Sequence, residues 1–213
     1  MRQRVGRPWL LKLGVFVVSL MPLAVLAWQT VTDSLGANPI KEITEQTGIW
    51  TLRFVLITLT VTPLRRLTGW NRVIQLRRML GLFAFFYGSL HFVTYVWLDQ
   101  FFNIQEIMVD VVERPFITAG FLSFVCLIPL AVTSTTTMIK RLGGKWWQRL
   151  HRLIYGIAVG GVVHYLWLVK ADVQPPLLYG GLVALLLGYR VWASYGRRPT
   201  PVHRPPRQAA MRT

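Results

Sequence analysis

Two histidines stand inside apolar stretches of this 213-residue sequence, where an ionisable side chain is expensive to bury and commonly has a function. His91 lies in the stretch from about 80 to 98, and His164 lies in the stretch from about 153 to 169. A neutral imidazole offers a nitrogen lone pair to a metal. Two imidazoles that face each other across a helix bundle can fill both axial positions of a haem iron. The residue types therefore indicate electron transfer at a six-coordinate haem.

The position of each histidine along its helix supports this pairing. If the two stretches are helices that run in the same direction, each histidine lies roughly 17 Å along its helix at 1.5 Å per residue. Each also has a glycine three residues earlier on the same helical face, Gly88 and Gly161, which leaves room for a flat porphyrin. The alternative is that each histidine only forms a hydrogen bond with a neighbouring helix. The matched depth and the shared Gly-x-x-His pattern favour haem ligation.

His151 has a different position. It precedes His164 by 13 residues, which is roughly 20 Å along a helix and on another face, so it cannot bind the same iron. A second haem near the inner membrane face needs a partner for His151 around positions 77 and 78, which are Arg77 and Arg78. Two interpretations of His151 stay open: a ligand of a second haem, and an interfacial histidine without a metal.

Six apolar stretches must position these histidines. A bilayer core needs about 20 apolar helical residues, and a composition that is 53% hydrophobic suits a membrane protein of this length. The predicted fold class is all-α, an integral membrane bundle of six transmembrane helices. The six stretches run from about 9 to 28, 50 to 64, 80 to 98, 116 to 133, 153 to 169 and 177 to 192.

Charged residues sort to opposite sides of these six stretches. Basic residues dominate the N-terminus, the second and fourth gaps and the tail, whereas all eight acidic residues lie in the first, third and fifth gaps. Because loops rich in Lys and Arg stay in the cytoplasm, both termini are predicted to be cytoplasmic. Topology and contacts with anionic lipid thereby explain the net charge of +16, and nucleic acid is not expected as a partner.

The chain is predicted to be one transmembrane domain, residues 1–195, followed by a basic tail. The tail, residues 196–213, is rich in proline and lacks apolar periodicity, so it is predicted to be disordered in the cytoplasm. The first stretch has a basic start and ends on Ala-Val-Leu-Ala at residues 24–27, which also resembles a signal peptide. Retention and cleavage of the first helix are both open.

Two gaps on the acidic side are predicted to contain short interfacial helices. In the first, Asn38 suits a helix cap and Pro39 suits the first helical position. The second, residues 99–114, places apolar residues between its acidic ones. No phosphate-binding loop, dinucleotide-binding glycine pattern or zinc motif is present, so electrons must arrive and leave through partners or small carriers.

Several short runs of this sequence resemble the MsrQ family, the haem-binding membrane subunits of bacterial methionine-sulfoxide reductase systems. That family belongs to the wider ferric-reductase-like transmembrane group, which includes the haem domains of NADPH oxidases. The runs that carry the resemblance are Thr62-Pro63-Leu64-Arg65-Arg66, Arg77-Arg78-Met79-Leu80-Gly81-Leu82, Ser89-Leu90-His91, Leu150-His151 and His164-Tyr165-Leu166-Trp167.

The resemblance implies an inner-membrane cytochrome b of six helices, with or without flavin mononucleotide (FMN). It implies that the chain takes electrons from the quinone pool and passes them to a periplasmic molybdopterin-dependent catalytic subunit, its partner in a heterodimer, which repairs oxidised methionines in proteins. The chain is thus expected to be an electron-transfer subunit and not the catalytic one. Two rivals stay open: a stand-alone transmembrane ferric reductase, and a haem-free transporter or scaffold.

The resemblance also places the family's haem histidines at His91, His151 and His164. His91 and His164 are the expected axial ligands of one haem b, and His151 is the candidate for a second. The wider group uses four histidines for two haems, and this chain has no histidine near Arg77. The expected number of haems therefore stays open between one and two.

Overall fold

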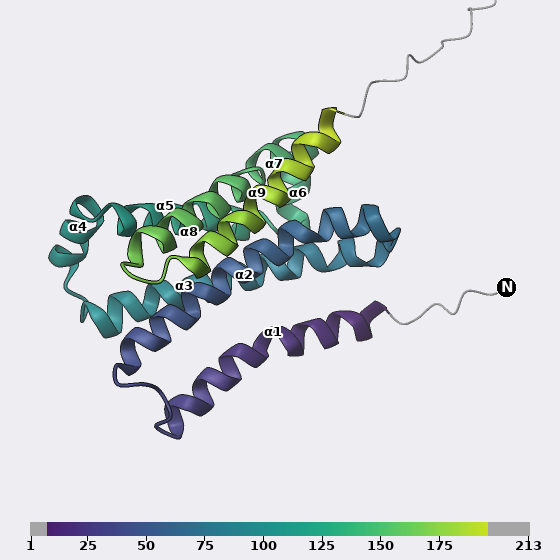
Figure 1. Ribbon diagram of the computed structural model, residues 1–213. Helices are drawn as coiled ribbons and strands as arrows, with labels where there is room; N and C mark the ends of the chain where they lie inside the picture. The colour runs from purple at the N-terminus through teal and green to yellow at the C-terminus, as the bar shows by residue number, and fades with distance from the viewer. Residues whose placement is uncertain (1–7, 196–213) are drawn as a thin grey trace, which may run out of the picture.

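The computed structural model describes residues 8–195, and every regular element in that range is helical, as Figure 1 shows. The prediction of an all-α fold is confirmed for this part of the chain. The predicted disordered tail, 196–213, lies outside the described residues. The elements are α1 (Pro8–Val31), α2 (Pro39–Thr68), η1 (Asn71–Leu76), α3 (Arg77–Thr94), η2 (Tyr95–Asp99), α4 (Ile104–Glu113), α5 (Pro115–Val132), α6 (Thr136–Leu142), α7 (Gly144–Leu150), α8 (Leu153–Leu168) and α9 (Gln174–Tyr195).

The helices describe a multi-pass membrane protein. Among residues 8–195, five segments are long and apolar enough to cross a bilayer: Trp9–Val31, Pro39–Thr68, Asn71–Asp99, Pro115–Val132 and Gln174–Tyr195. In the first and the last two of these, only 11% of the most apolar window is buried inside the protein, so their apolar side chains face outward, toward where lipid would lie. The sixth predicted stretch forms α8, whose 16 residues span about 24 Å, less than the ~30 Å core.

The connection before α2 corrects one prediction. Asn38 does cap a helix, because its side chain accepts a hydrogen bond from the backbone N–H of Lys41, and Pro39 occupies the first turn. That helix is α2 itself, which continues without a break for 30 residues. The separate interfacial helix expected there is therefore wrong. The second short helix is confirmed as α4, which is also capped by an asparagine, Asn103.

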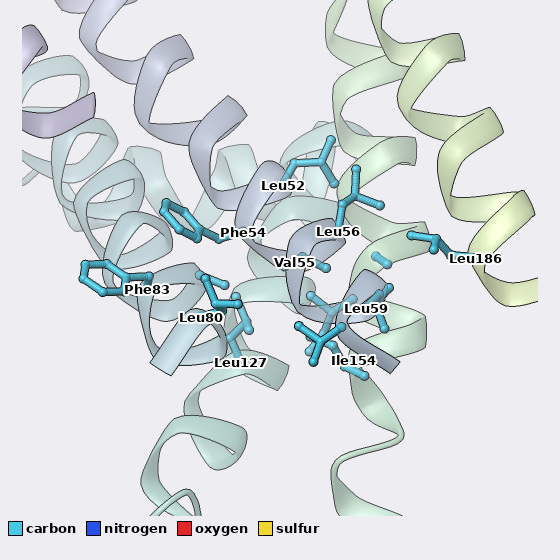
Figure 2. Close-up of a cluster of buried hydrophobic side chains, with 14 of the residues drawn as sticks. Leu52, Phe54, Val55, Leu56, Leu59, Leu80, Phe83, Leu127, Ile154 and Leu186 are labelled. Carbon is cyan, nitrogen blue, oxygen red and sulfur yellow. The ribbon is translucent and has the colours of Figure 1, made fainter. Parts of the chain in front are cut away.

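The core of the bundle is built around α2. It packs most extensively on α3, while α5 packs most extensively on α8, and α9 lies against both α8 and α2. Figure 2 shows the apolar side chains that meet between these helices. Phe54 of α2 stacks on Phe83 and Tyr87 of α3, with ring centroids 5.5 and 5.2 Å apart. Two antiparallel helix pairs, α2 with α3 and α5 with α8, thus form the frame that holds the site.

The ends of the bundle differ in what they carry. Figure 1 shows the start of α1 and the end of α9 at the same end, together with α6 and α7. The α1–α2 connection, the α8–α9 connection and α4 lie at the opposite end, called the α4 end below. His91 lies in the last turn of α3, and His164 lies close to the end of α8. Both histidines are therefore near the α4 end.

Candidate functional site

His91 of α3 is held by the neighbouring helix α2. Its ring Nδ1 lies 2.8 Å from the backbone carbonyl oxygen of Thr44. Because a carbonyl oxygen only accepts hydrogen bonds, Nδ1 must carry the proton. The neutral ring then keeps a lone pair on Nε2, which is the form that binds a metal.

His164 of α8 is held in the same way by α5. Its ring Nδ1 lies 2.6 Å from the backbone carbonyl oxygen of Phe116. The same argument places the proton on Nδ1 and the lone pair on Nε2. In metal sites, a hydrogen bond from the second ring nitrogen commonly fixes the tautomer and the orientation of a histidine ligand. Both rings have this bond.

A glycine lies against each ring. A Cβ atom added at Gly48 of α2 would be 3.0 Å from Cε1 of His91, and one added at Gly120 of α5 would be 2.7 Å from Nδ1 of His164. Contacts between 3.0 and 3.4 Å are already tighter than a real Cβ normally makes. Only glycine at these two positions lets the imidazoles approach the neighbouring helix this closely.

The rings of His91 and His164 lie close to each other inside the bundle. Their centroids are 6.0 Å apart and their planes are inclined by 73°. With metal–nitrogen bonds of about 2 Å on both sides, two axial imidazoles have centroids about 6 Å apart. The residues therefore fit a haem iron between His91 and His164. The expectation that the two histidines share a depth is confirmed.

The number of ligands also fits haem better than a metal held by protein alone. Within residues 8–195, no group of three or more His, Cys, Asp or Glu side chains is close enough to hold a metal ion. A zinc site needs at least three protein ligands. A haem iron takes four nitrogens from the porphyrin, so it needs only two from the protein. Two histidine ligands are therefore enough for a haem iron but too few for a zinc ion.

The glycines expected to face the porphyrin have another role. A Cβ added at Gly88 would meet side chains of Thr51, Phe124 and Leu127 at 3.4 to 3.6 Å, and one at Gly161 would meet Leu52 at 3.4 Å. These are ordinary packing contacts between helices. Gly88 and Gly161 were predicted to lie against a porphyrin. In the structure, side chains of neighbouring helices lie against both glycines instead.

His151 lies apart from the other two histidines. It follows α7 in the turn before α8, where its ring stacks on Trp147 with centroids 3.9 Å apart and Nδ1 lies 3.1 Å from the Trp147 carbonyl oxygen. Burial lowers the pKa of His151, and the positive charge of Arg77 lowers it further. The structure thus places His151 near Arg77 at the end opposite α4, and it brings no second histidine to it within the described residues.

Comparison with known proteins identifies the family of this chain. Residues 46–162, more than half of the chain, match the family described as ferric reductase like transmembrane component. A protein of Herminiimonas arsenicoxydans, the protein-methionine-sulfoxide reductase heme-binding subunit MsrQ, is 56% identical over 191 residues, 89% of this chain and 88% of its own. This chain belongs to the MsrQ family.

Other MsrQ proteins extend the match over nearly the whole chain. The MsrQ of Azospira oryzae is 51% identical over 182 residues, 85% of this chain and 78% of its own. The MsrQ of Xanthomonas campestris pv. campestris is 48% identical over 208 residues, 94% of this chain and 95% of its own. The resemblance read from the short runs is therefore confirmed, as is membership of the ferric-reductase-like group.

Sequence reasoning missed the parts of this chain that hold the two histidines. Gly48, Gly120 and the carbonyl groups of Thr44 and Phe116 were not singled out. A signal for them exists: the hydrogen-bonded carbonyl precedes its histidine by 47 residues in one case and 48 in the other, and a glycine follows each carbonyl after one helical turn. This repeated spacing is visible in the sequence once both histidines are aligned.

Proposed function

We propose that this chain holds b-type haem between His91 and His164 and carries electrons as the membrane subunit of a protein-methionine-sulfoxide reductase. The observation that carries the proposal is the 6.0 Å separation of two imidazole rings that both bind backbone carbonyls through Nδ1. The printed names of its relatives, heme-binding subunits of that reductase, support it.

The protein's own contribution is to hold the two histidine ligands in fixed orientations. The carbonyls of Thr44 and Phe116 fix each ring by its Nδ1 proton, so both Nε2 lone pairs are directed elsewhere. Haem bound there supplies a one-electron carrier whose potential depends on its axial ligands and its surroundings. Both histidines are half-buried between apolar helices.

The proposed electron path runs from the quinone pool to a periplasmic molybdopterin-dependent catalytic subunit. The word subunit in the relatives' names supports such a partner. The position of both histidines near the α4 end supports delivery to the outer side, because all eight acidic residues lie at that end: in α4, in η2, in the first two turns of α2 and in the α1–α2 and α8–α9 connections. FMN stays a prediction of the resemblance, and a second haem at His151 stays open beside a purely structural role.

The proposed topology is six crossings of a bacterial inner membrane with both termini in the cytoplasm. It requires α8 to be the sixth crossing although it has only 16 residues. A short apolar helix can cross where the bilayer thins or flanking residues extend to the interface. The common end shared by the start of α1 and the end of α9 supports an even number of crossings.

Spectroscopy of the purified full-length protein tests the proposal. A pyridine-haemochrome assay with reduced-minus-oxidised spectra should give b-type, low-spin haem in the wild type. His91→Ala and His164→Ala should each remove the low-spin spectrum, whereas His151→Ala, the matched histidine control, should retain it. An unchanged spectrum in His164→Ala would refute the assignment. Colourless protein from a haem-supplemented culture would instead favour a transporter or scaffold.

A second experiment separates the electron-transfer subunit from a stand-alone ferric reductase. The reduced, purified chain is mixed with a ferric chelate in one reaction, and with the periplasmic catalytic subunit and an oxidised peptide in another. We expect haem oxidation to be faster with the catalytic subunit and to yield repaired methionine. Rapid turnover with the ferric chelate alone would support the ferric reductase, which the family description of residues 46–162 makes the natural rival.

A further inference from the structure

We propose that Gly48 and Gly120, each with the carbonyl group one turn before it, are two equivalent positioning elements that set the electron donation of the axial histidines. The inference rests on the proposed haem ligation and deepens it. It assigns a role to two glycines and two backbone carbonyls on α2 and α5, the helices that carry no proposed haem ligand. The two carbonyls belong to Thr44 and Phe116.

The two elements have the same construction. In α2, the Thr44 carbonyl accepts the Nδ1 proton of His91, and Gly48 lies against the ring atoms Cε1 and Nδ1. In α5, the Phe116 carbonyl accepts the Nδ1 proton of His164, and Gly120 lies against the same two ring atoms. Residues four apart lie above one another on a helix face, so carbonyl and glycine form one shallow seat for an imidazole edge.

The hydrogen bond is short because the glycine has no side chain. With a Cβ present, the His164 ring would have to move away from Gly120, since 2.7 Å is closer than real Cβ contacts. The nearest atom of His91 would be at 3.0 Å from a Cβ at Gly48, which demands a smaller movement. The seat of His164 is therefore the tighter one, in agreement with its shorter hydrogen bond of 2.6 Å against 2.8 Å.

The chemical consequence follows from the charge that the bond places on the ring. An Nδ1 proton shared with a carbonyl makes the imidazole a more basic ligand. Axial ligation and hydrogen bonding are among the factors that set the haem potential. A more basic axial ligand stabilises ferric iron relative to ferrous iron. Moving the ring off its seat weakens the bond, so the midpoint potential should become more positive.

The competing explanation is that these glycines only allow close packing of helices, and the chain offers a control for it. Gly160 of α8 packs on α5, where a Cβ would clash with Oγ of Ser123 and touch no histidine. Gly160→Ala therefore disturbs the same helix pair as Gly120→Ala without pushing His164. Gly156, also in α8, has nothing within 4 Å of an added Cβ and controls for the substitution itself.

The experiment compares haem-bound full-length variants in detergent, with all signals normalised per haem. We expect Gly120→Ala to shift the midpoint potential upward and to change the ferric low-spin electron paramagnetic resonance spectrum, or to lose the low-spin signal. Gly48→Ala should change both in the same direction by less. Gly160→Ala should lower haem content or thermal stability only, and Gly156→Ala should resemble the wild type.

Several outcomes would overturn the inference. If Gly48→Ala and Gly120→Ala both keep the wild-type potential and spectrum per haem, the glycines serve packing alone. If neither variant accumulates, pulsed electron paramagnetic resonance on the wild type tests the inference. Slow exchange of both Nδ1 protons in heavy water would support the two hydrogen bonds to the carbonyls, and rapid exchange would refute them. Should His164→Ala retain the low-spin spectrum, the proposed function fails; if it loses that spectrum while the glycine variants match the wild type, only this inference fails.

Discussion

The guanidinium group of Arg190 donates a hydrogen bond from Nη2 to the backbone carbonyl of Leu59, at 2.8 Å. That carbonyl has no partner within its own helix, because the residue four positions later is Pro63, which has no N–H. An arginine on α9 thus replaces the missing bond of α2. Arg190 also donates from Nη1 to the hydroxyl of Tyr155 at 3.0 Å and so joins three helices.

Removing this arginine should destabilise the bundle, and the loss should depend on Pro63. Arg190→Met leaves the Leu59 carbonyl unpaired, which costs about 1 to 3 kcal/mol of unfolding free energy. Pro63→Ala restores an N–H to that carbonyl, so Arg190→Met should cost less in the Pro63→Ala background. Thermal unfolding of the four proteins of this double-mutant cycle in detergent measures the difference. Equal costs in both backgrounds would disprove the coupling.

Tyr87→Phe should loosen the attachment of α1. The Tyr87 hydroxyl donates to the carbonyl of Ser19 at 2.8 Å and accepts from the N–H of Leu23 at 3.2 Å. These two groups would otherwise bond each other within α1, so the hydroxyl is inserted into the helix ladder next to Pro22. We expect a loss of roughly 1 kcal/mol, seen as faster hydrogen exchange in α1 while α5 stays protected. Unchanged exchange in α1 would show that apolar contacts alone hold it.

Under the proposed ligation, His151→Ala should leave the haem between His91 and His164 in place. Its ring lies on Trp147 at the end opposite α4, away from His91 and His164. Absorption and resonance spectra should keep the low-spin signature of the facing pair, and the haem-to-chain ratio measures any second site. A ratio that falls by half would assign a second haem to His151. Complete loss of the low-spin signal would contradict the separation of the two sites.

Withholding haem should weaken one end of the bundle selectively. His91 and His164 come from different helix pairs, so under the proposed ligation an iron between them would tie α3 to α8. Protein made under haem limitation should exchange amide hydrogens faster at the last turns of α3 and α8. The middle of α2, where Val55 and Leu59 are fully buried, should change little. Uniform acceleration across all helices would mean that haem supports the whole fold instead.

The sequence predicted the elements well where apolar length decides them. The stretches at 80–98 and 153–169 become α3 with η2, and α8, because continuous apolar residues leave little alternative to a helix in a membrane. The meeting of His91 with His164 was also predictable, since equal depth on helices running the same way follows from counting residues.

What the sequence did not reveal depends on rotation about the helix axes. Gly88 was expected to face a porphyrin, but it faces Thr51 and Phe124, whereas Gly48 and Gly120 face the histidines. Depth is fixed by residue count, while the direction in which a residue points is fixed by which helices pack together. The apolar stripes in this chain are nearly as hydrophobic on the lipid side as inside, so the pattern cannot indicate the inward face.

His91 and His164 lie on two different antiparallel helix pairs, so the two halves of the site are made at different times during synthesis. The seat of His91 is complete once α2 and α3 have been made, while its counterpart still has to be translated. At about 5 to 20 residues per second, roughly 4 to 15 seconds pass before His164 is added to the chain. Under the proposed ligation, a haem captured earlier would be held through one axial bond and left open to other ligands. Stable cofactor insertion must therefore wait until the second hairpin has entered the membrane.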